Sequence, residues 1–542
     1  MALKFKLASL ALMMALFLNC TLQACCLADH PSNEFRDIDK YALNAPDNAK
    51  VSIQALATYL TKPARNDREK ARAIFRWIAN NIDYNVSGFF NGTYGNSTAE
   101  GVLRSGRSVC GGYSNLFESL ANASGLETVT ITGYAKGYNY TPGLKFSGST
   151  NHAWNAVKID GKWQLVDSTW GAGYLENGKY TREFDDHYFL TPPEELIYDH
   201  FPEDQQWQLL NRPLTKEEFE ILVYLKSNFF NLGLSLENPK DAIIISHGLT
   251  NITLNAPEDV HIMAELKRIG KNASSERTYG SPVLVRRAKE QYLIEMLPPL
   301  PGEYILRVYG KHGSDEGIYR DVMEYKVVEL SGSKSSFPIV FDEFFDLGMR
   351  MNNHNNGTIE ANGKANLSLY APQNILIMVS LEKLDRNGNP SQEGKSSTFL
   401  QRFDDRYDLE ILPPTPGEYV LNVFAKRKED PNSYQGVLRY NVSASSGSDL
   451  IFPETFSDFQ QNGVYLCSPL TGNLKSGLNQ TFKLKIPGAE DAAIISGHDW
   501  HQLTKTGDIF QGESIIRKGE VNVGAKYSGK DEYSILLRYN GV

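Results

Sequence analysis

The sequence predicts a multidomain protein, with an α+β domain near the N-terminus followed by three all-β repeats. The chain has 542 residues, which at about 100–200 residues per domain corresponds to about three to five domains. Its C-terminal half repeats itself at a constant shift of 115 residues. Between residues 60 and 210, helical patterns and a hairpin pattern carry a cysteine, a histidine and an aspartate in an order that suggests chemistry.

The composition excludes several classes of protein. Hydrophobic residues make up 41% and charged residues 22% of the chain, which is typical of a globular protein and not of a disordered chain, a fibre or a polytopic membrane protein. The net charge is −9 and no basic stripe is visible, so nucleic acid is not an expected partner. Five cysteines are too few for a disulfide framework in a chain of this length.

Residues 1–26 have the pattern of an export signal. Lys4 and Lys6 precede an apolar run of 12 residues, Leu7 to Leu18, which is too short to span a bilayer. Leu22-Gln23-Ala24-Cys25 resembles the bacterial lipobox, in which the cysteine is lipidated after cleavage. The alternative is ordinary secretion, and 11 Asn-x-Ser/Thr sequons after the signal would suit a secreted eukaryotic glycoprotein. We therefore expect an extracytoplasmic protein, either secreted or anchored in a membrane through lipidated Cys25.

Two amphipathic helices are predicted in the α+β domain, residues 27–215. Asn66 or Asp67 caps the first, which runs from Arg68 to Ile82 with one apolar face. The second follows Cys110-Gly111-Gly112, has apolar residues at helical spacing, and ends at Gly125. Cys110 therefore lies at, or one residue before, the start of a buried helix, where free backbone N–H groups and the helix dipole favour a thiolate.

A hairpin pattern places a histidine beside an aspartate. Asp160-Gly161 separates two strand-like runs and is a strong signal for a two-residue turn. With that turn, paired residue numbers sum to 321, so His152 and Asp167 lie on one face as diagonal neighbours. At roughly 7 Å between Cβ atoms, a carboxylate can orient an imidazole.

The repeats begin near residue 216. Phe229 to Leu234 returns as Phe344 to Met349, and Leu297 to Tyr304 returns as Leu412 to Tyr419. Lys518-Gly519-Glu520-Val521 is a shortened third copy of the Pro-Gly-Glu-Tyr turn. Apolar residues alternate with a period of two after each turn, so each unit of about 100 residues is predicted to be an immunoglobulin-like sandwich. The expected repeats are residues 216–333, 334–448 and 449–542.

A set of motifs is spread over about residues 50–212. They are Trp77 to Tyr84, Ser108 to Tyr113, Gly133 to Tyr138, His152 to Val157, Trp163 to Trp170, Tyr188 to Leu190, His200 to Pro202 and Trp207 to Leu209. With these motifs the segment resembles the transglutaminase-like superfamily, whose fold is papain-like, and within it the kyphoscoliosis-peptidase branch. That branch also carries immunoglobulin-like repeats after its core. One departure is Ser108, where the family more often has glycine before Val-Cys.

These residue types predict a cysteine-dependent enzyme that acts on protein or peptide amides. Cys110 is the expected nucleophile, His152 the base and acid, and Asp167 the group that orients the imidazole. The Cys110 backbone N–H is one expected oxyanion donor, while the second donor stays open, with Tyr84 as a candidate. Peptidase, deamidase and transamidase activities use the same three groups, so the choice among them also stays open.

The remaining expectations concern the surroundings of this triad. Five aromatic residues either line a dry acyl site or pack in the core, and His187 and His200 are expected to have structural roles. No cofactor or metal is expected. The alternative function is a non-catalytic adhesion or scaffold protein, whose repeats bind a protein or a surface polymer while the triad is idle. The five aromatic residues are Trp154, Trp163, Trp170, Tyr134 and Tyr138.

Overall fold

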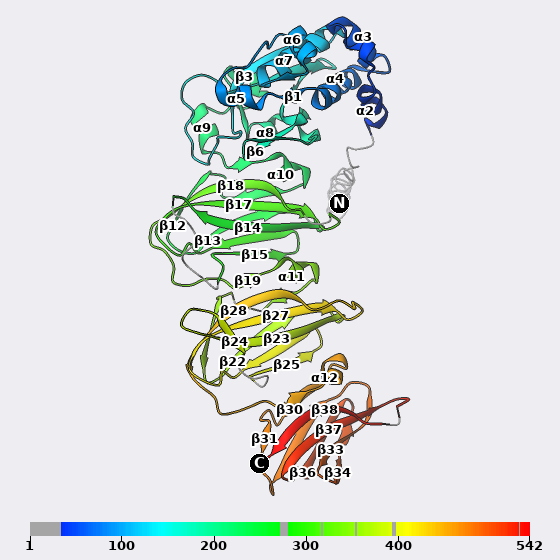
Figure 1. The fold of residues 1–542 in the computed structure, drawn as a ribbon, viewed down its shortest axis with the longest axis vertical. Coiled ribbons are helices and arrows are strands. Elements are labelled where there is room, and N and C mark those ends of the chain that lie inside the picture. Colours follow the sequence, from blue (N-terminus) through cyan, green and yellow to red (C-terminus); the bar gives the residue numbers. More distant parts are fainter. Residues whose placement is uncertain (1–33, 271–279, 316–317, 353–354, 393–396, 531) are drawn as a thin grey trace, which may run out of the picture. The chain divides into compact units, whose positions relative to one another are not determined.

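The computed structural model describes residues 34–270, 280–315, 318–352, 355–392, 397–530 and 532–542. The chain forms two compact units, Met1–Leu222 and Val223–Val542 (Figure 1). The expected export signal, residues 1–26 with Cys25, lies outside the described residues. Within the described ranges, no helix is both long and apolar enough to cross a membrane.

The first unit contains most of the described helices. Their starts follow from capping side chains: Ser52, Asn66 and Thr98 each accept a hydrogen bond from a backbone N–H in the first turn of α3, α4 and α6. Helix α4 buries Ile74 and Phe75 in the core. The helices are α2 (Arg36–Leu43), η2 (Asp47–Ala49), α3 (Ile53–Thr61), α4 (Asp67–Asn81), α5 (Val86–Asn91), α6 (Ala99–Ser105), α7 (Cys110–Ala123), η3 (Trp170–Ala172), η4 (Asp186–Tyr188), α8 (Pro193–Leu196), η5 (Gln205–Gln208) and α9 (Lys216–Ile221).

One five-stranded antiparallel sheet, with strand order β8-β5-β4-β3-β9, packs against α7. Its strands are β3 (Thr128–Ala135), β4 (His152–Ile159), β5 (Lys162–Val166), β8 (Phe189–Thr191) and β9 (His200–Pro202). Asp160 and Gly161 form the two-residue turn between β4 and β5, both with positive φ, 51° and 78°. Asn155 pairs with Val166, so the predicted hairpin register is confirmed.

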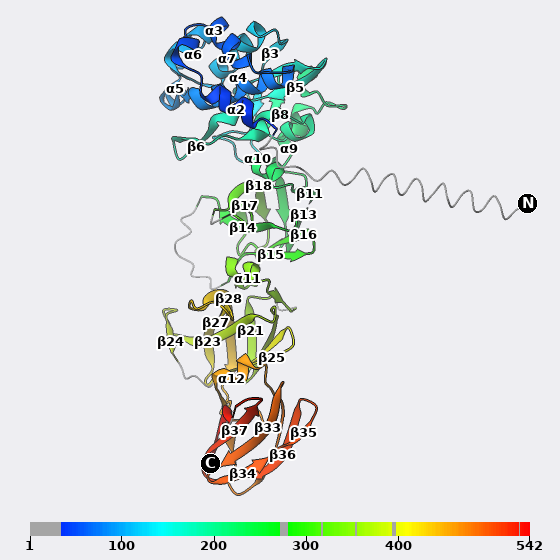
Figure 2. The same ribbon diagram turned by 90° about the vertical axis from the view of Figure 1, so that its right-hand side faces the viewer.

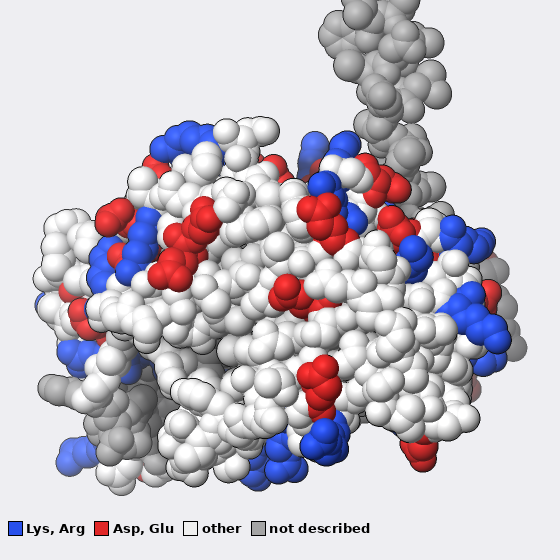
Figure 3. Space-filling model, turned by 90° about the horizontal axis from the view of Figure 1, so that it is seen from above, with Lys and Arg blue, Asp and Glu red and all other residues white. Residues whose placement is uncertain are grey.

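Two short ribbons complete the first unit. Strands β1 (Asp83–Tyr84) and β2 (Arg107–Ser108) are parallel, with Tyr84 opposite Ser108. Strands β6 (Gly173–Glu176) and β7 (Lys179–Arg182) form an antiparallel hairpin. Figure 3, a space-filling view, shows basic and acidic side chains interspersed around the edge and few across the middle.

The second unit consists of three β-sandwiches, each preceded or interrupted by a short helix. The first pairs the sheet β10-β18-β17-β14, joined by β12, with the sheet β11-β13-β16-β15. Figure 2 shows these two sheets as two layers. Its elements are β10 (Tyr224–Leu225), α10 (Ser227–Asn231), β11 (Ser235–Asn238), β12 (Ile243–Ser246), β13 (Thr250–Asn255), β14 (Val260–Arg268), β15 (Val283–Ala288), β16 (Gln291–Met296), β17 (Gly302–His312) and β18 (Arg320–Glu329).

The other two sandwiches repeat this topology, and each has one further edge strand, β24 or β34, in its larger sheet. The second contains β19 (Ile339–Val340), α11 (Asp342–Asp346), β20 (Arg350–Met351), β21 (Thr358–Asn362), β22 (Ala365–Tyr370), β23 (Ile375–Leu384), β24 (Pro390–Gln392), β25 (Thr398–Phe403), β26 (Arg406–Ile411), β27 (Gly417–Arg427) and β28 (Gln435–Ser446). The third contains β29 (Glu454–Thr455), α12 (Ser457–Gln461), β30 (Tyr465–Ser468), β31 (Asn473–Leu474), β32 (Asn479–Lys485), β33 (Ala489–Ser496), β34 (Asp499–Gln502), β35 (Thr504–Thr506), β36 (Ile509–Ile515), β37 (Gly519–Tyr527) and β38 (Ser534–Gly541).

The repeated Pro-Gly-Glu-Tyr turn builds the tyrosine corner of immunoglobulin-like domains. The hydroxyl of Tyr304 donates to the Leu300 carbonyl over 2.7 Å, and that of Tyr419 donates to the Thr415 carbonyl over the same distance. In the third copy Val521 replaces the tyrosine and has no hydroxyl to donate. The predicted fold class, an α+β core followed by immunoglobulin-like sandwiches, is confirmed.

Candidate active site

Cys110 is the first residue of helix α7. The residue before it, Val109, has no side chain that can cap the helix, and no side-chain cap is formed there. By contrast, the Asn66 side chain accepts a hydrogen bond from the Glu69 N–H at the start of α4. The Gly112 N–H donates to the Val109 carbonyl at 3.0 Å, and no side chain competes for the start of α7. The positive end of the helix dipole therefore lies at the half-buried Cys110, where it favours a thiolate.

The two glycines after Cys110 differ in the space that surrounds them. A Cβ atom on Gly112 would lie 2.0 Å from Ser108 Oγ and 2.7 Å from Val102 Cγ2, so close packing requires glycine there. A Cβ atom on Gly111 would meet nothing within 4 Å, so this position is open beside the thiol. Only Gly111 therefore has the free space that a substrate backbone approaching Cys110 needs.

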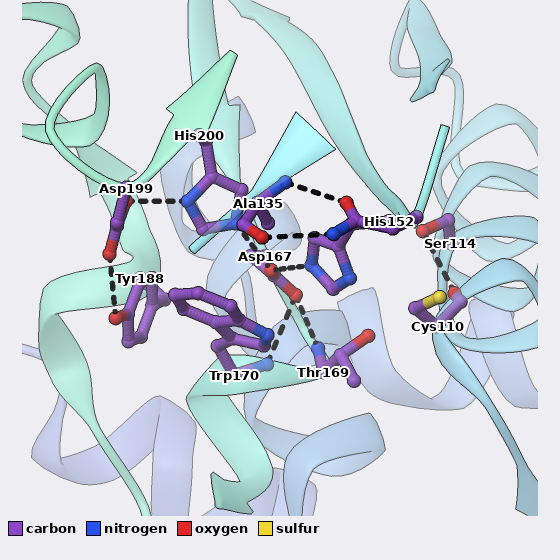
Figure 4. A network of polar contacts seen from close by, with 11 residues as sticks. Cys110, Ser114, Ala135, His152, Asp167, Thr169, Trp170, Tyr188, Asp199 and His200 are labelled. Atoms are coloured by element: carbon purple, nitrogen blue, oxygen red, sulfur yellow. Dashed lines mark hydrogen bonds and ion pairs between the residues drawn. The ribbon is translucent and has the colours of Figure 1, made fainter. Parts of the chain in front are cut away.

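His152 and Asp167 form a buried pair, as Figure 4 shows, with His152 lying between Asp167 and Cys110. His152 Nε2 lies 2.6 Å from Asp167 Oδ2. The other carboxylate oxygen, Oδ1, accepts from the backbone N–H groups of Thr169 at 2.7 Å and Trp170 at 3.0 Å. Because Asp167 binds Nε2, the remaining ring nitrogen Nδ1 is the one available to Cys110. The structure thus brings together the three residues that the sequence singled out.

The electrostatics of the three groups favour charge separation. Burial raises the pKa of the Cys110 thiol, but the hydrogen bond and charge of His152 outweigh it, so the pKa is lowered overall. Burial lowers the pKa of His152, but the charge and hydrogen bond of Asp167, helped by Cys110, raise it well above its usual value. The carboxyl of Asp167 is buried, yet its two histidine partners hold its pKa far below the usual range. The preferred state is a thiolate beside an imidazolium.

Two asparagines fix the strand that carries His152. Asn151 forms a two-way pair with the backbone of Ala135, its Oδ1 accepting at 2.7 Å and its Nδ2 donating at 3.0 Å. Asn155, which is fully buried, donates from Nδ2 to the carbonyl of Ser114 on α7 at 3.1 Å. These contacts tie β4 to β3 on one side and to the cysteine-bearing helix on the other.

His200 is the residue that sequence reasoning underrated, because it contacts Asp167 directly. Its Nε2 lies 3.0 Å from Asp167 Oδ2, the same oxygen that binds His152, and its Nδ1 lies 2.6 Å from Asp199 Oδ1. Asp199 Oδ2 in turn accepts from the Tyr188 hydroxyl at 3.2 Å. The run His200-Phe201-Pro202, already part of the family resemblance, was the available signal. His187 Nδ1 lies 3.7 Å from Glu195 Oε2, and its ring packs on Tyr188 at a centroid distance of 5.1 Å.

The five aromatic residues considered from the sequence divide into two groups. Trp154 and Trp170 pack around the histidines, with ring centroids 6.0 Å and 5.3 Å from that of His152. Trp163 instead packs on Trp207, and the Tyr134 hydroxyl donates to the Gly148 carbonyl. Tyr138 is 41% exposed and packs on Phe89 and Phe90, in a row of rings that continues through Phe89 to Tyr84.

Three possible metal-ligand atoms, from His152, Asp167 and His200, lie within 4.8 Å of one another. Each is already engaged, because both imidazole Nε2 atoms point at the one carboxylate oxygen Oδ2. At 2.6 Å and 3.0 Å these are hydrogen-bond separations. Hydrogen bonding therefore accounts for the arrangement, and we assign no metal to it.

Comparison with known proteins agrees with this geometry. Residues 54–168 match the transglutaminase-like superfamily, and residues 216–338 and 333–455 match the KY-like, immunoglobulin-like domain. Kyphoscoliosis peptidase of Homo sapiens is 30% identical over 526 residues, which are 93% of this chain and 77% of that protein. The chain belongs to the kyphoscoliosis-peptidase family. The Mus musculus protein is also 30% identical, over 90% of this chain and 74% of its own length.

Another relative matches a smaller part of this chain. Hillarin of Drosophila melanogaster is 35% identical over 243 residues, which are 42% of this chain and 30% of that protein. The transglutaminase-like match ends at residue 168, so it includes Cys110, His152 and Asp167 but not His200. The contact between His200 and Asp167 comes from the structure alone.

Proposed function

We propose that the protein is a cysteine-dependent enzyme that transfers acyl groups from protein or peptide amides through a thioester on Cys110. The observation that carries this proposal is the buried pair of His152 and Asp167 beside a thiol whose pKa is lowered at the start of a helix. A purely structural cysteine is inert because burial in apolar surroundings keeps it protonated. Here the imidazole and the uncapped helix terminus act in the opposite direction.

The chemistry follows from the protonation states. The Cys110 thiolate attacks the amide carbonyl carbon, forming a C–S bond, and the carbonyl oxygen becomes an oxyanion. When the oxyanion collapses, the C–N bond breaks and the His152 imidazolium gives its proton to the leaving amine. Water or a second amine then attacks the thioester and loses its proton to His152. The C–S bond breaks, which releases the carboxylic acid or the new amide and restores the Cys110 thiolate beside the imidazolium. Asp167 stays ionised throughout and holds the imidazole by Nε2.

The oxyanion needs donors near Cys110. Its own backbone N–H is one, at the uncapped start of α7. Tyr84 is our choice for the second, because the β1–β2 pairing sets it opposite Ser108, two residues before the nucleophile. Burial, and then the charges of Cys110 and Asp167, raise the pKa of Tyr84 well above 10, so its hydroxyl keeps its proton and can donate.

Alkylation tests this proposal without a known substrate. Iodoacetamide at pH 6–7 should label Cys110 much faster than Cys467, the exposed free cysteine of the β-repeats. His152→Ala should slow labelling of Cys110 sharply and leave that of Cys467 unchanged. Equal labelling of the two cysteines, insensitive to that substitution, would exclude an activated nucleophile.

The reaction type requires a second experiment. Candidate proteins are incubated with the full chain and a labelled primary amine, and the products are analysed by mass spectrometry. Incorporated amine indicates transamidation, new termini indicate proteolysis, and conversion of glutamine to glutamate indicates deamidation. Cys110→Ala is the matched control, since it removes only the sulfur nucleophile.

A second candidate function is non-catalytic adhesion or scaffolding by the immunoglobulin-like sandwiches. It is favoured by the size of the second unit, residues 223–542, and by the absence of any cluster of possible metal ligands within its described residues. Under this proposal, the repeats bind a protein or a surface polymer. The full chain carrying Cys110→Ala would then retain the whole biological effect, whereas the enzyme proposal requires that the effect be lost.

We also propose that the protein is exported, from the pattern of residues 1–26. Radioactive palmitate incorporated into the unaltered protein but not into Cys25→Ser would identify a lipid anchor. A mature N-terminus near Ala24 or Ala28 without palmitate would identify simple secretion. An intact N-terminus on protein recovered from the cytosol would contradict export.

A further inference from the structure

His200 lies between two buried carboxylates, and this fixes its charge. Its Nε2 faces Asp167 Oδ2 at 3.0 Å and its Nδ1 faces Asp199 Oδ1 at 2.6 Å. Ionised carboxylates only accept hydrogen bonds, so both ring nitrogens must carry a proton. The side chains of His200 and Asp167 are completely buried and that of Asp199 is 4% exposed. The imidazolium therefore replaces the water that would otherwise stabilise two anions.

The same cation lies within reach of the reacting pair. The ring centroids of His200 and His152 are 5.2 Å apart, and both rings donate to the one oxygen of Asp167. A carboxylate oxygen shared by two donors is a weaker acceptor for each, and a positive charge at this distance favours an anion and disfavours a second cation. His200 therefore stabilises the thiolate form of Cys110 and destabilises the imidazolium form of His152.

We propose that His200 is a positioning residue, held as a permanent imidazolium between Asp167 and Asp199, that keeps Asp167 ionised and sets the working pH range of the Cys110–His152 pair. This inference rests on the proposed function for its use in catalysis. The charge state itself rests only on the contacts of His200.

The titratable groups around His200 are consistent with this role. Burial lowers its pKa, but the charge of Asp199 and the hydrogen bonds to both aspartates raise the pKa overall. Tyr188 contributes a neutral hydroxyl, and burial lowers the pKa of His187, which leaves that ring uncharged at neutral pH. The rings of Trp154 and Trp170 close two further sides, at centroid distances of 5.0 Å and 4.5 Å. The groups that face His200 or its partners are Asp167, Asp199, His152, His187, Tyr188 and, through Asp199, Lys136.

The pH profile of Cys110 alkylation tests the proposal. With the anionic reagent iodoacetate, the rate in the unaltered protein rises as the thiolate forms and falls as His152 loses the positive charge that attracts the carboxylate of the reagent. His200→Gln keeps a hydrogen-bond donor for Asp167 but removes the positive charge, so both limbs should move to higher pH, by about one unit. A role confined to packing would lower the rate or the stability without moving the two limbs together, and limbs that stay in place would overturn the proposal.

His187→Gln is the matched control. It replaces another buried histidine of the same region whose imidazole is already neutral, so it removes no charge and both limbs should stay where they are. If His187→Gln moves the limbs as far as His200→Gln does, the effect is not specific to the cation beside Asp167 and the proposal fails.

A measurement on the unaltered sequence covers the case in which His200→Gln does not fold. The full chain, which has 10 histidines, is labelled with ¹⁵N-histidine, and Cys110 is blocked by iodoacetamide to remove the thiolate beside His152. One histidine besides His152, whose own signal is identified by its loss in His152→Ala, should keep both ring nitrogens protonated at pH 8. Neutral rings throughout would overturn the proposal, and this result does not depend on whether the enzyme is active. If the rate of Cys110 labelling is the same in His152→Ala as in the unaltered protein, that result counts against the proposed function alone.

Discussion

Asn155 Nδ2 donates a hydrogen bond to the backbone carbonyl of Ser114 over 3.1 Å, and this contact joins the strand that carries His152 to the helix that carries Cys110. Asn155 lies three residues after His152 and is fully buried. Ser114 lies one helical turn after Cys110, and its hydroxyl donates back to the Cys110 carbonyl at 3.1 Å. The distance between thiol and imidazole is thus fixed by a polar contact inside the core as well as by apolar packing.

Replacing Asn155 should therefore disturb both stability and reactivity. Asn155→Ala leaves the Ser114 carbonyl without its buried donor, at a cost of about 1–3 kcal/mol. Five of the six tryptophans lie in the first unit, and only Trp500 lies in the second. Tryptophan fluorescence during urea unfolding therefore reports mainly on the first unit. We expect a lower unfolding midpoint together with slower alkylation of Cys110 in the folded protein. Lys158→Ala, in the same strand, should change neither, and normal alkylation of Asn155→Ala would show that the contact does not align the pair.

The two glycines after Cys110 should respond differently to alanine. Gly112→Ala places a Cβ atom 2.0 Å from Ser108 Oγ, so we expect a loss of about 1–3 kcal/mol or more through overpacking. Gly111→Ala meets no atom within 4 Å and replaces a poor helix former, so the unfolding free energy should stay constant or rise by up to about 1 kcal/mol.

Ser108 provides the control for that prediction. Ser108→Gly removes the nearest clashing atom, so the double variant Ser108→Gly/Gly112→Ala should recover part of the lost stability, the remainder being due to Val102 at 2.7 Å. Strictly additive effects in the double variant, measured by urea unfolding, would show that the two positions do not interact.

The sequence predicted those parts of the site that depend on local geometry. The Asp160-Gly161 turn sets the register of β4 and β5, so the approach of His152 to Asp167 could be predicted by counting residues. The start of α7 at Cys110 likewise follows from the apolar spacing after it. Both relationships span few residues, and neither requires knowledge of how distant segments pack.

His200 could not be placed in this way. It enters the site because β9 pairs with β3, with Ala135 opposite His200, and the two residues are far apart in the sequence. No turn or spacing sets the register of such a distant pair. The requirement for glycine at position 112 could not be predicted either, because it depends on the close approach of Ser108, before α7, and of Val102 on α6.

Lys136 should make the stability of the first unit depend on pH. It is fully buried, donates from Nζ to the Leu222 carbonyl at 2.9 Å, and lies 4.5 Å from the centre of the Phe219 ring. Burial lowers its pKa to about 7, although Asp199 and Glu220 oppose the shift. The unfolded lysine keeps a pKa of about 10.4, so between these values the unfolded state binds more protons and the unfolding free energy rises with pH.

Lys136→Met tests the expected rise of the unfolding free energy with pH. The charged amine is unfavourable in the core below pH 7, so the variant should be more stable than the unaltered protein there, by roughly 3 kcal/mol after the loss of one hydrogen bond. The advantage should shrink steadily as the pH is raised to about 10, where Lys136 is already neutral in the folded state. Lys136→Arg, which keeps the charge at all these pH values, should be destabilised throughout. A difference between the methionine variant and the unaltered protein that is independent of pH, in urea unfolding at pH 6, 8 and 10, would contradict the assignment.

Tyr84→Phe separates nucleophile activation from stabilisation of the oxyanion. Alkylation by iodoacetamide displaces iodide at a saturated carbon and forms no oxyanion, so the variant should alkylate Cys110 at close to the normal rate. Acyl transfer passes through a tetrahedral oxyanion, and loss of one donor typically lowers the rate constant by about 10²–10³-fold. We therefore expect amine incorporation or hydrolysis to fall by that order while alkylation is unchanged. Tyr180→Phe, which alters the ring stacked on Tyr84, is the control for packing and should leave both rates near normal. Equal losses of alkylation and acyl transfer in Tyr84→Phe would mean that the hydroxyl supports the thiolate and not the oxyanion.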